Sequence, residues 1–504
     1  MPAADAAHPP RIVIVGGGFT GASAAVQAVR HSRGPLAITL LDPAEQAGRG
    51  LAYSTTDPDH RLNAPAFVHS LLPDDAWHLI RWCEQQDILA ADPQALRPDG
   101  CSYLRRSDFG RYIGQTLQAH SQGWASGATI THRRDTAVGL SDAAGLLTVQ
   151  TASGQPLLAD LVLVATGHPA PRLPPPFAAG LAAHPAVIEH PLNNERLHTI
   201  PAAARVLLLG SGLTALDLLS TLVQRGHHGP IEVVSRHGLR PRPQGPLPAA
   251  LSQALQGDLT TLPPSLVLAR LNSPAPAFLA APAVAPDLRQ WLRALRAQIR
   301  QAQTAGGTWY TPFDDLRDAV WRLWPTLPAA QRQRFVRTLR PWYDVHRYRS
   351  APQNDDIVRA AVADGRIRFQ AARLQAVDAA SDNVAIAVRM LLRGESRPVQ
   401  RQFDAVINCT GQDAAASTVR NPFLAALAQA GQVRPDPTGI GVEVDADCRA
   451  VAASGAAQPA LRVLGPPSVG SRGDAIGAMF IAAQIHRMLP GALAGLARLD
   501  AAAR

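Results

Sequence analysis

Two glycine-rich segments, residues 16–21 (GGGFTG) and 210–215 (GSGLTA), carry the strongest chemical signal in the chain. Each directly follows a short apolar run, residues 11–15 (RIVIV) and 205–209 (RVLLL). A glycine-rich turn between a strand and a helix lets the backbone and the helix N-terminus approach a pyrophosphate. One such turn is weak evidence, but two in the same context predict that the polypeptide binds two dinucleotides. That pairing is typical of hydride transfer from a nicotinamide to a flavin, so we expect FAD and NAD(P)H as cofactors.

The first turn contains every part of a dinucleotide-binding fingerprint. Gly16 allows the tight turn, Gly18 lets the backbone approach the pyrophosphate, and Gly21 lets the helix pack against the strand. Asp42 follows the next predicted strand, residues 37–41, about 20 residues beyond the last glycine, where an acid accepts ribose hydroxyls. This ordered set favours a nucleotide site over an ordinary strand-to-helix turn with an incidental acid.

The second turn differs from the first at the positions that distinguish one dinucleotide from another. Gly210 and Gly212 are present, but the third position is Ala215, and the next predicted strand ends in Ser235 and Arg236 rather than in an acid. A carboxylate at that tip selects a free 2′-hydroxyl, whereas an arginine accommodates a 2′-phosphate. The segment therefore favours NADPH over NADH, with solvated arginines that bind no ligand as the alternative.

Two further apolar strands frame the second turn. Residues 161–164 run into Thr166 and Gly167, and residues 404–408 run into a similar Thr-Gly ending at Gly411. Such endings let the chain cross close to a bound dinucleotide without a side-chain clash. Their positions predict that the chain leaves the first domain near residue 167 and returns to it near residue 404.

We therefore predict an α/β protein with two Rossmann-type dinucleotide-binding domains, the second inserted in the first. Residues 1–185 and 401–504 form the FAD-binding domain, and residues 186–400 form the NAD(P)H-binding domain, with a helical insertion at about 245–345. Within the insertion, residues 287–303 show an amphipathic helical pattern that is typical of a core-facing stripe. The insertion either shapes a substrate pocket over the flavin or serves as a structural or oligomerisation subdomain. The apolar stripe consists of Leu288, Trp291, Leu292, Leu295 and Ile299.

Composition excludes several classes of function. The 504 residues carry a net charge of +9 but contain no lysine, so all 48 basic residues are arginine and lysine-based catalysis is impossible. No basic stretch is interleaved with aromatic residues, so no nucleic-acid partner is expected. The four cysteines are too widely spaced for a dithiol relay or a zinc site, and no metal is predicted. They are Cys83, Cys101, Cys409 and Cys448.

The chain shows no signal-peptide pattern at its N-terminus and no apolar stretch long enough to span a membrane. We therefore expect a cytoplasmic protein without a membrane partner. Its expected partners are a small-molecule substrate and O2, and the sequence leaves its oligomeric state open.

Further motifs resemble those of a bacterial family of FAD/NAD(P)-binding flavoprotein monooxygenases. Residues 48–54 (GRGLAYS), 60–65 (HRLNAP) and 165–167 (ATG) join the two glycine turns in the family's order. The resemblance covers the first 240 residues and resumes from about 404 to 487, without a motif in the central helical region. Members include a FAD-dependent urate hydroxylase and an aspartate N-oxygenase that forms nitrosuccinate. The chain is more distantly similar to the N-hydroxylating ornithine and lysine monooxygenases.

The resemblance implies a set of cofactor-binding residues. A C-terminal segment, residues 464–474, matches a loop that closes over the flavin ahead of a helix at residues 475–488, although the sequence Ser-Arg-Gly-Asp at residues 471–474 departs from the family pattern. For FAD the implied residues are Gly16, Gly18, Phe19, Thr20, Gly21, Asp42, Arg49, Ser54, Asn63, Thr166, Gly167, Gly411 and Asp474. For the nicotinamide dinucleotide they are Gly210, Gly212, Ala215, Ser235 and Arg236.

The implied function is FAD-dependent, NAD(P)H-using hydroxylation of a small nitrogen-containing molecule, with urate as the first compound to test. Because the cofactor carries the chemistry, no catalytic side chain is assigned. The alternatives are an amino-acid or amine N-hydroxylase and an NAD(P)H:acceptor flavin oxidoreductase without oxygenation. A nucleotide sensor with a degenerate site is a third class, which the two intact turns disfavour.

Two sets of residues are candidates for a direct role with the substrate. His60, His168 and His346 are possible acid–base groups, although each also fits a structural histidine. A polar-aromatic cluster at the end of the helical insertion has the chemistry to bind an anion such as urate or a carboxylate, with a solvated helix end as the alternative. The cluster consists of Tyr343, Arg347, Tyr348 and Arg349.

Overall fold

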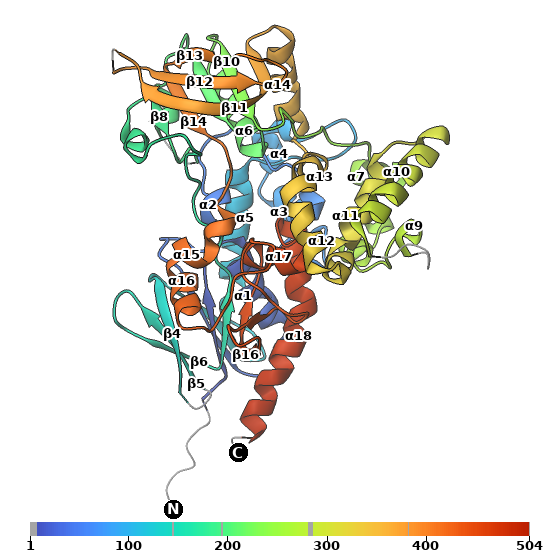
Figure 1. Cartoon of the computed structure of the whole chain (residues 1–504). Coiled ribbons are helices and arrows are strands. Elements are labelled where there is room, and N and C mark those ends of the chain that lie inside the picture. Colours follow the sequence, from blue (N-terminus) through green and yellow to red (C-terminus); the bar gives the residue numbers. More distant parts are fainter. Residues whose placement is uncertain (1–7, 144–145, 193–194, 281–285, 382, 503–504) are drawn as a thin grey trace, which may run out of the picture.

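Three β-sheets organise the computed structural model, which describes residues 8–143, 146–192, 195–280, 286–381 and 383–502 (Figure 1). Part of the N-terminal segment considered above, residues 1–7, thus lies outside the described chain. The first sheet has the order β15-β16-β7-β1-β2-β3. Its strands are β1 (Arg11–Val15), β2 (Leu36–Leu41), β3 (Ala128–Arg133), β7 (Leu161–Val164), β15 (Arg449–Val451) and β16 (Ala457–Val463).

The central strand of this sheet is apolar throughout because both of its faces are covered. β1 pairs in parallel with β2 on one side and with β7 on the other. Successive side chains of a strand point to opposite faces. Ile12 and Ile14 therefore join the core on the helical face, while Val13 and Val15 join a second core on the opposite face. That opposite face is covered by α16 (Pro422–Gln429) and a three-stranded sheet of β4 (Ala137–Ala143), β5 (Leu146–Thr151) and β6 (Leu157–Ala159).

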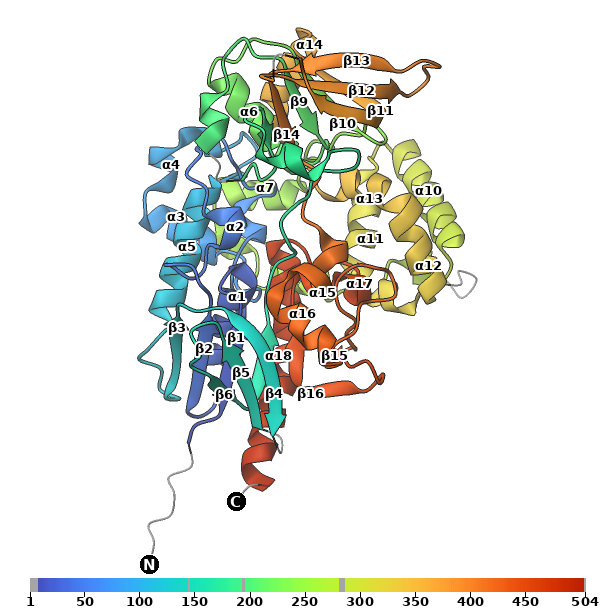
Figure 2. The ribbon, with the colours of Figure 1, turned by 60° about the vertical axis from the view of Figure 1, so that its left-hand side comes forward.

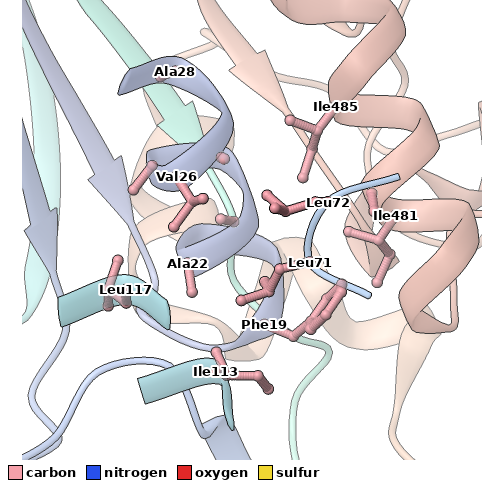
Figure 3. Close-up of a cluster of buried hydrophobic side chains, with 14 of the residues drawn as sticks. Phe19, Ala22, Val26, Ala28, Leu71, Leu72, Ile113, Leu117, Ile481 and Ile485 are labelled. Carbon is pink, nitrogen blue, oxygen red and sulfur yellow. The ribbon is translucent and has the colours of Figure 1, made fainter. Parts of the chain in front are cut away.

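The helical face brings the two ends of the chain together. It is covered by α1 (Phe19–His31), α5 (Arg106–Ala119) and α18 (Ala478–Ala502). In Figure 3, Phe19 and Val26 of α1 lie close to Leu71 and to Ile481 and Ile485 of α18. The helix expected at residues 475–488 is therefore present, but it begins at Ala478 and is longer than the pattern predicts.

The second sheet lies above the first in Figures 1 and 2 and has the order β13-β12-β11-β10-β9-β14-β8. The strand β9 of the second glycine turn pairs in parallel with β10 and with β14. Helices α6 (Leu213–Gln224) and α14 (Pro352–Ala363) cover one face. The strands are β8 (Val187–Ile188), β9 (Val206–Leu209), β10 (Ile231–Ser235), β11 (Ile367–Ala379), β12 (Ile386–Leu392), β13 (Val399–Phe403) and β14 (Ala405–Asn408).

The position of β14 corrects one expectation. The sequence pattern assigns this strand to the first domain, as part of residues 401–504, but it pairs with β9 and β8 of the second sheet. The pattern is ambiguous because each sheet has a strand beside its glycine turn, β7 in the first and β14 in the second. The chain returns to the first sheet only at β15. The three-part domain division stays a proposal, with its last part beginning beyond β14.

The helical insertion lies between β10 and β11 and extends to the right of the sheets in Figure 1. The amphipathic pattern at residues 287–303 forms α10, whose first turn is capped by the Asp287 carboxylate. Helix α12 runs into a π-helical turn at Phe335–Leu339 and continues as α13. The helices are α7 (Ala249–Gln256), α8 (Leu266–Leu271), α9 (Ala277–Ala280), α10 (Leu288–Thr304), α11 (Tyr310–Leu323), α12 (Ala329–Arg334) and α13 (Arg340–Arg347).

A buried polar network joins the elements of the two sheets. Arg106 of α5 contacts the Asp217 carboxylate of α6 at 2.7 Å, and Asn354 of α14 donates to the same carboxylate at 3.1 Å. Thr221 of α6 donates to Asp57 at 2.8 Å. Breaking a buried network of this kind costs more than the loss of an exposed ion pair, because its polar groups have no access to water.

The core between α1 and α18 gives a stability prediction. Leu71 has no exposed surface, so Leu71→Ala should lower the free energy of unfolding by about 2–5 kcal/mol through lost burial and a residual cavity. The matched control Leu158→Ala, at a side chain that is 47% exposed, should change it by no more than about 0.5 kcal/mol. Urea titration of both variants measures the difference, and equal losses would show that Leu71 is not part of a rigid core.

Candidate functional site

A cavity of about 490 Å³ lies at the carboxyl end of β1, beside the first glycine turn. This is the edge at which parallel α/β sheets bind ligands, because the helix N-termini and loops converge there. Predicted site residues that line the cavity are Gly16, Gly18, Phe19, Thr20, Asp42, Arg49, Thr166 and Gly167. Tyr53, within the motif of residues 48–54, also lines it, and lining residues without a sequence signal come from distant segments and include Thr136, Gln412, Phe423, Ile476 and Gly477.

The three fingerprint glycines have different physical reasons to be glycine. Gly16 has φ +107°, and a Cβ there would lie 2.7 Å from the Ala165 carbonyl oxygen. At Gly21 a Cβ would lie 1.9 Å from the Gly16 oxygen, so α1 can approach β1 only without a side chain. At Gly18 a Cβ would meet no atom closer than 3.5 Å. Protein packing therefore requires the first two glycines, whereas Gly18 leaves open a cradle that a ligand can fill.

Asp42 is held at the edge of this cradle. Its Oδ2 atom accepts a hydrogen bond from Gly17 N at 2.6 Å, and its Oδ1 atom accepts one from Ala44 N at 2.8 Å. The carboxylate is half-buried and lines the cavity. The anchoring fixes an acceptor beside the glycine turn, where a ribose would lie.

Two residues that follow β7 and line the cavity each carry an unsatisfied polar atom. Thr166 Oγ1 and His168 Nε2 are buried and have no hydrogen-bond partner within the described chain. The other ring nitrogen of His168 lies 3.0 Å from Ser417 Oγ. Buried polar atoms are almost always hydrogen-bonded, so these two have hydrogen-bonding capacity left for a ligand or an ordered water.

Other predicted residues lie away from this cavity. Gly21 packs α1 against its strand, and Gly411 is adjacent to the lining residue Gln412. Ser54 Oγ donates to the Leu51 carbonyl oxygen at 3.3 Å. Asn63 donates to the Arg349 carbonyl oxygen at 3.3 Å and so links the first domain to the end of the insertion. Their roles toward a cofactor stay predictions.

The second glycine turn repeats the geometry of the first. Gly210 has φ +98°, and a Cβ there would lie 2.4 Å from the Cys409 carbonyl oxygen, just as Gly16 abuts Ala165. Gly212 has no atom near its Cβ direction, and Ala215 is fully buried against the second sheet. The turn is thus formed, with an open position at its second glycine.

The tip after β10 has one anchored and one exposed residue. Ser235 Oγ accepts a hydrogen bond from Gly238 N at 3.0 Å, which closes the turn. Arg236 is exposed, and the ring of His237 packs at a tilt against that of Trp342 in the insertion, with 6.0 Å between the ring centroids. A positive charge is therefore available at the tip where a 2′-phosphate would lie.

The polar-aromatic cluster at the end of the insertion is not an anion site. Arg347 is buried and its Nη2 atom donates to Asp474 Oδ1 at 3.2 Å and to the Ile476 carbonyl oxygen at 3.1 Å. Arg349 is buried and its Nη1 atom donates to Asp314 Oδ2 at 3.1 Å. The anion-binding interpretation is wrong because each guanidinium already holds a carboxylate. The alternative, a solvated helix end, is wrong because neither guanidinium is solvated. Asp474, expected beside the flavin, is the partner of Arg347.

The remaining histidine candidates differ in their surroundings. His60 is buried at the interface of the two sheets, with Nδ1 at 3.1 Å from Thr55 Oγ1 and Nε2 at 3.7 Å from Asp57. His346 donates through Nδ1 to the Trp342 carbonyl oxygen at 2.7 Å, and burial lowers the pKa of its ring. Neither lines the cavity beside the first turn.

The described residues offer neither a candidate metal site nor a membrane-spanning helix. Within them, no group of three or more His, Cys, Asp or Glu side chains is placed to hold a metal ion. No helix among them has the length and hydropathy needed to cross a bilayer. All four cysteines are buried and unpaired, and burial raises the pKa of Cys83 to about 12.

Comparisons with known proteins identify the fold. Residues 13–169 match a family model described as FAD-NAD(P)-binding, and no curated protein matches the chain. Lysine 6-monooxygenase of Pseudomonas syringae is 18% identical with a TM-score of 0.61, and the match covers 97% of this chain and 99% of that one. Ornithine hydroxylase of Pseudomonas aeruginosa is 15% identical with a TM-score of 0.59, covering 97% and 100%.

A third solved structure has a different printed activity. Bacillithiol disulfide reductase of Staphylococcus aureus is 12% identical with a TM-score of 0.52, covering 97% of this chain and 99% of that one. At such identities the likeness establishes the fold. It confirms the predicted α/β class, with two Rossmann-type domains and a helical insertion.

His168 gives a prediction about pH. Burial, and then the charge of Arg340, lower the pKa of His168 to about 4. As the pH falls from 6.5 toward 4, the unfolded chain binds a proton that the folded chain refuses, so the free energy of unfolding falls. His168→Gln removes this contribution and should lose less stability over that range. Urea unfolding at several pH values measures it, with His8→Gln at an exposed position as control. Parallel pH profiles for the wild type and His168→Gln would contradict the assignment.

Proposed function

We propose that the protein is a FAD-dependent NAD(P)H monooxygenase that hydroxylates an amine nitrogen. The observation that carries this proposal is the cavity beside the first glycine turn, with its open cradle at Gly18 and its two unsatisfied polar atoms. The second turn, formed in its own sheet, supplies the site for the electron donor. FAD held there would supply the redox chemistry that couples NAD(P)H oxidation to the use of O2.

The residues around the cavity fit FAD in chemistry as well as in shape. The backbone at Gly18 and the N-terminus of α1 would hold the pyrophosphate, and Asp42 would accept the ribose hydroxyls. Thr166 and His168 would supply hydrogen bonds to polar groups of the flavin end. The match of residues 13–169 to a FAD-NAD(P)-binding model supports the same assignment.

The preferred donor is NADPH. The exposed Arg236 offers its guanidinium at the strand tip, and Arg240 is nearby with its guanidinium 5.7 Å from the ring of Phe369. No carboxylate occupies the position that would select the free 2′-hydroxyl of NADH.

An amine substrate is favoured over urate. The arginines expected to bind a planar anion are occupied by Asp474 and Asp314. Solved structures of the same fold include a lysine monooxygenase, ornithine hydroxylases and a cadaverine monooxygenase. In the proposed reaction, NADPH, a proton, O2 and R–NH2 give NADP⁺, water and R–NHOH. One oxygen atom forms the N–O bond and the other leaves as water, with two electrons from NADPH and two from the amine.

A second candidate is an NAD(P)H:acceptor oxidoreductase, because the bacillithiol disulfide reductase shares the fold. A thiol relay within the chain is disfavoured, since the four cysteines are buried and none is paired. Burial also raises the pKa of Cys101 to about 12, which suppresses its thiolate.

The cradle at Gly18 gives a direct test of the FAD site. Gly18→Val should keep the fold, because the backbone there has φ −73° and the nearest atom to an added Cβ, Gly50 Cα, lies at 3.5 Å. FAD should bind about 5- to 150-fold more weakly, since overpacking costs about 1–3 kcal/mol. The control Gly34→Val, at an open surface position, should retain FAD. Flavin absorbance after gel filtration, with a thermal melt for folding, reports both. A folded Gly18→Val protein with full FAD would refute this site.

The reaction class is tested with the FAD-loaded protein. After anaerobic reduction by NADPH, O2 is admitted with lysine, ornithine, cadaverine, the uncharged 1-naphthylamine or urate, and hydroxylated product and hydrogen peroxide are quantified. A monooxygenase with a suitable amine couples NADPH oxidation to product. Oxygen consumption that yields only hydrogen peroxide with every amine, together with rapid reduction of an artificial electron acceptor, would support the second candidate instead.

A further inference from the structure

A second cavity of about 540 Å³ lies inside the helical insertion. Its size falls within the range of small-molecule sites, about 300–1,000 Å³. The apolar stripe of α10 faces it: Leu288 and Leu295 are buried, but Trp291, Leu292 and Ile299 remain half-buried around the space. The stripe therefore lines a chamber and does not simply fill a core.

Two walls of this chamber connect it to the nucleotide sites. Gly473 lines the chamber, and Ile476 and Gly477, a few residues along the chain, line the cavity beside the first turn. Trp324, another wall residue, donates from Nε1 to the Gly470 carbonyl oxygen at 2.7 Å. On another side, Trp342 packs against His237, the neighbour of Arg236.

The chemistry of the chamber is predominantly aromatic and aliphatic. Its lining contains no Asp or Glu among the described residues, and its one arginine, Arg296, is exposed. Its aromatic walls are Trp291, Trp309, Phe313, Trp324, Phe335, Trp342 and Tyr343. A polar group in such a surrounding is costly unless it is hydrogen-bonded. A free ammonium or carboxylate would thus find no partner in most of this space.

One residue that lines the chamber, Tyr343, carries an unsatisfied polar atom. The Tyr343 hydroxyl is buried and has no hydrogen-bond partner in the described chain. Burial raises the pKa of Tyr343, so its hydroxyl stays protonated and can donate. His346 lines the same side and holds the Trp342 carbonyl oxygen through Nδ1.

We propose that this chamber binds the body of the substrate, and that this body is an uncharged aromatic or branched apolar group with one hydrogen-bonding atom that meets the Tyr343 hydroxyl. The proposal rests on the proposed function, which supplies the reacting nitrogen, and it narrows the substrate class to apolar amines. The chamber's position between the two nucleotide loops supports a substrate role over a purely structural one.

The binding test uses N-phenyl-1-naphthylamine, an uncharged aromatic amine whose emission rises in apolar surroundings. Wild-type protein should bind it, with quenching of tryptophan emission. Leu292→Glu places a carboxylate in the chamber and should weaken binding roughly ten-fold or more. The matched control Ala297→Glu puts the same charge on an exposed position of α10 and should bind as the wild type does. No binding by the wild type, or equal binding by all three proteins, would overturn the proposal.

A second variant keeps the test informative if Leu292→Glu does not fold. Tyr343→Phe should weaken binding of 1-naphthylamine by roughly two- to ten-fold while leaving naphthalene unchanged, since only the amine can bond the hydroxyl. Equal effects on both probes would overturn the role of Tyr343. FAD content and NADPH oxidation are recorded in parallel. Bound FAD without probe binding refutes the chamber alone, and probe binding without FAD refutes the proposed function alone.

Discussion

The buried ion pair between Arg347 and Asp474 is the contact on which the arrangement of the two cavities depends. It joins the last helix of the insertion to the C-terminal segment that separates the two cavities. The Arg347 guanidinium also lies 4.4 Å from the ring of Phe480 on α18. An isolated buried charge is costly, so each partner requires the other. Because both groups are fixed, the insertion and the loop beside the first turn form one unit.

A second constraint is repeated in both sheets. In each, the first glycine of the turn packs against a carbonyl oxygen at the end of the neighbouring parallel strand, Ala165 for Gly16 and Cys409 for Gly210. The strands after the turns thus have equivalent positions, which explains why residues 161–167 and 404–411 look alike in sequence. The same backbone geometry leaves an open position at the second glycine of each turn. Both positions lie at strand ends, where ligands bind in α/β proteins.

The arginine-rich composition has a structural explanation. Many guanidinium groups are matched by aspartates, as in the buried pair of Arg61 with Asp92 at 2.8 Å and in that of Arg106 with Asp217 at 2.7 Å. In these pairs the positive charge is engaged inside and between the domains. In contrast, the chamber of the insertion is nearly devoid of charge. The sites proposed for the anionic cofactors and the chamber proposed for the substrate therefore differ in their charge.

The sequence by itself determined the features that depend on short-range sterics and periodicity. The glycine turns, their flanking strands, Asp42 and the helix of residues 288–304 all follow from neighbouring residues, because backbone freedom and side-chain alternation act over a few positions. Only the tertiary structure decided that β14 belongs to the second sheet. It alone paired Arg347 with Asp474, 127 residues away, and left a chamber behind the α10 stripe. Such contacts depend on how distant segments pack, which no local pattern encodes.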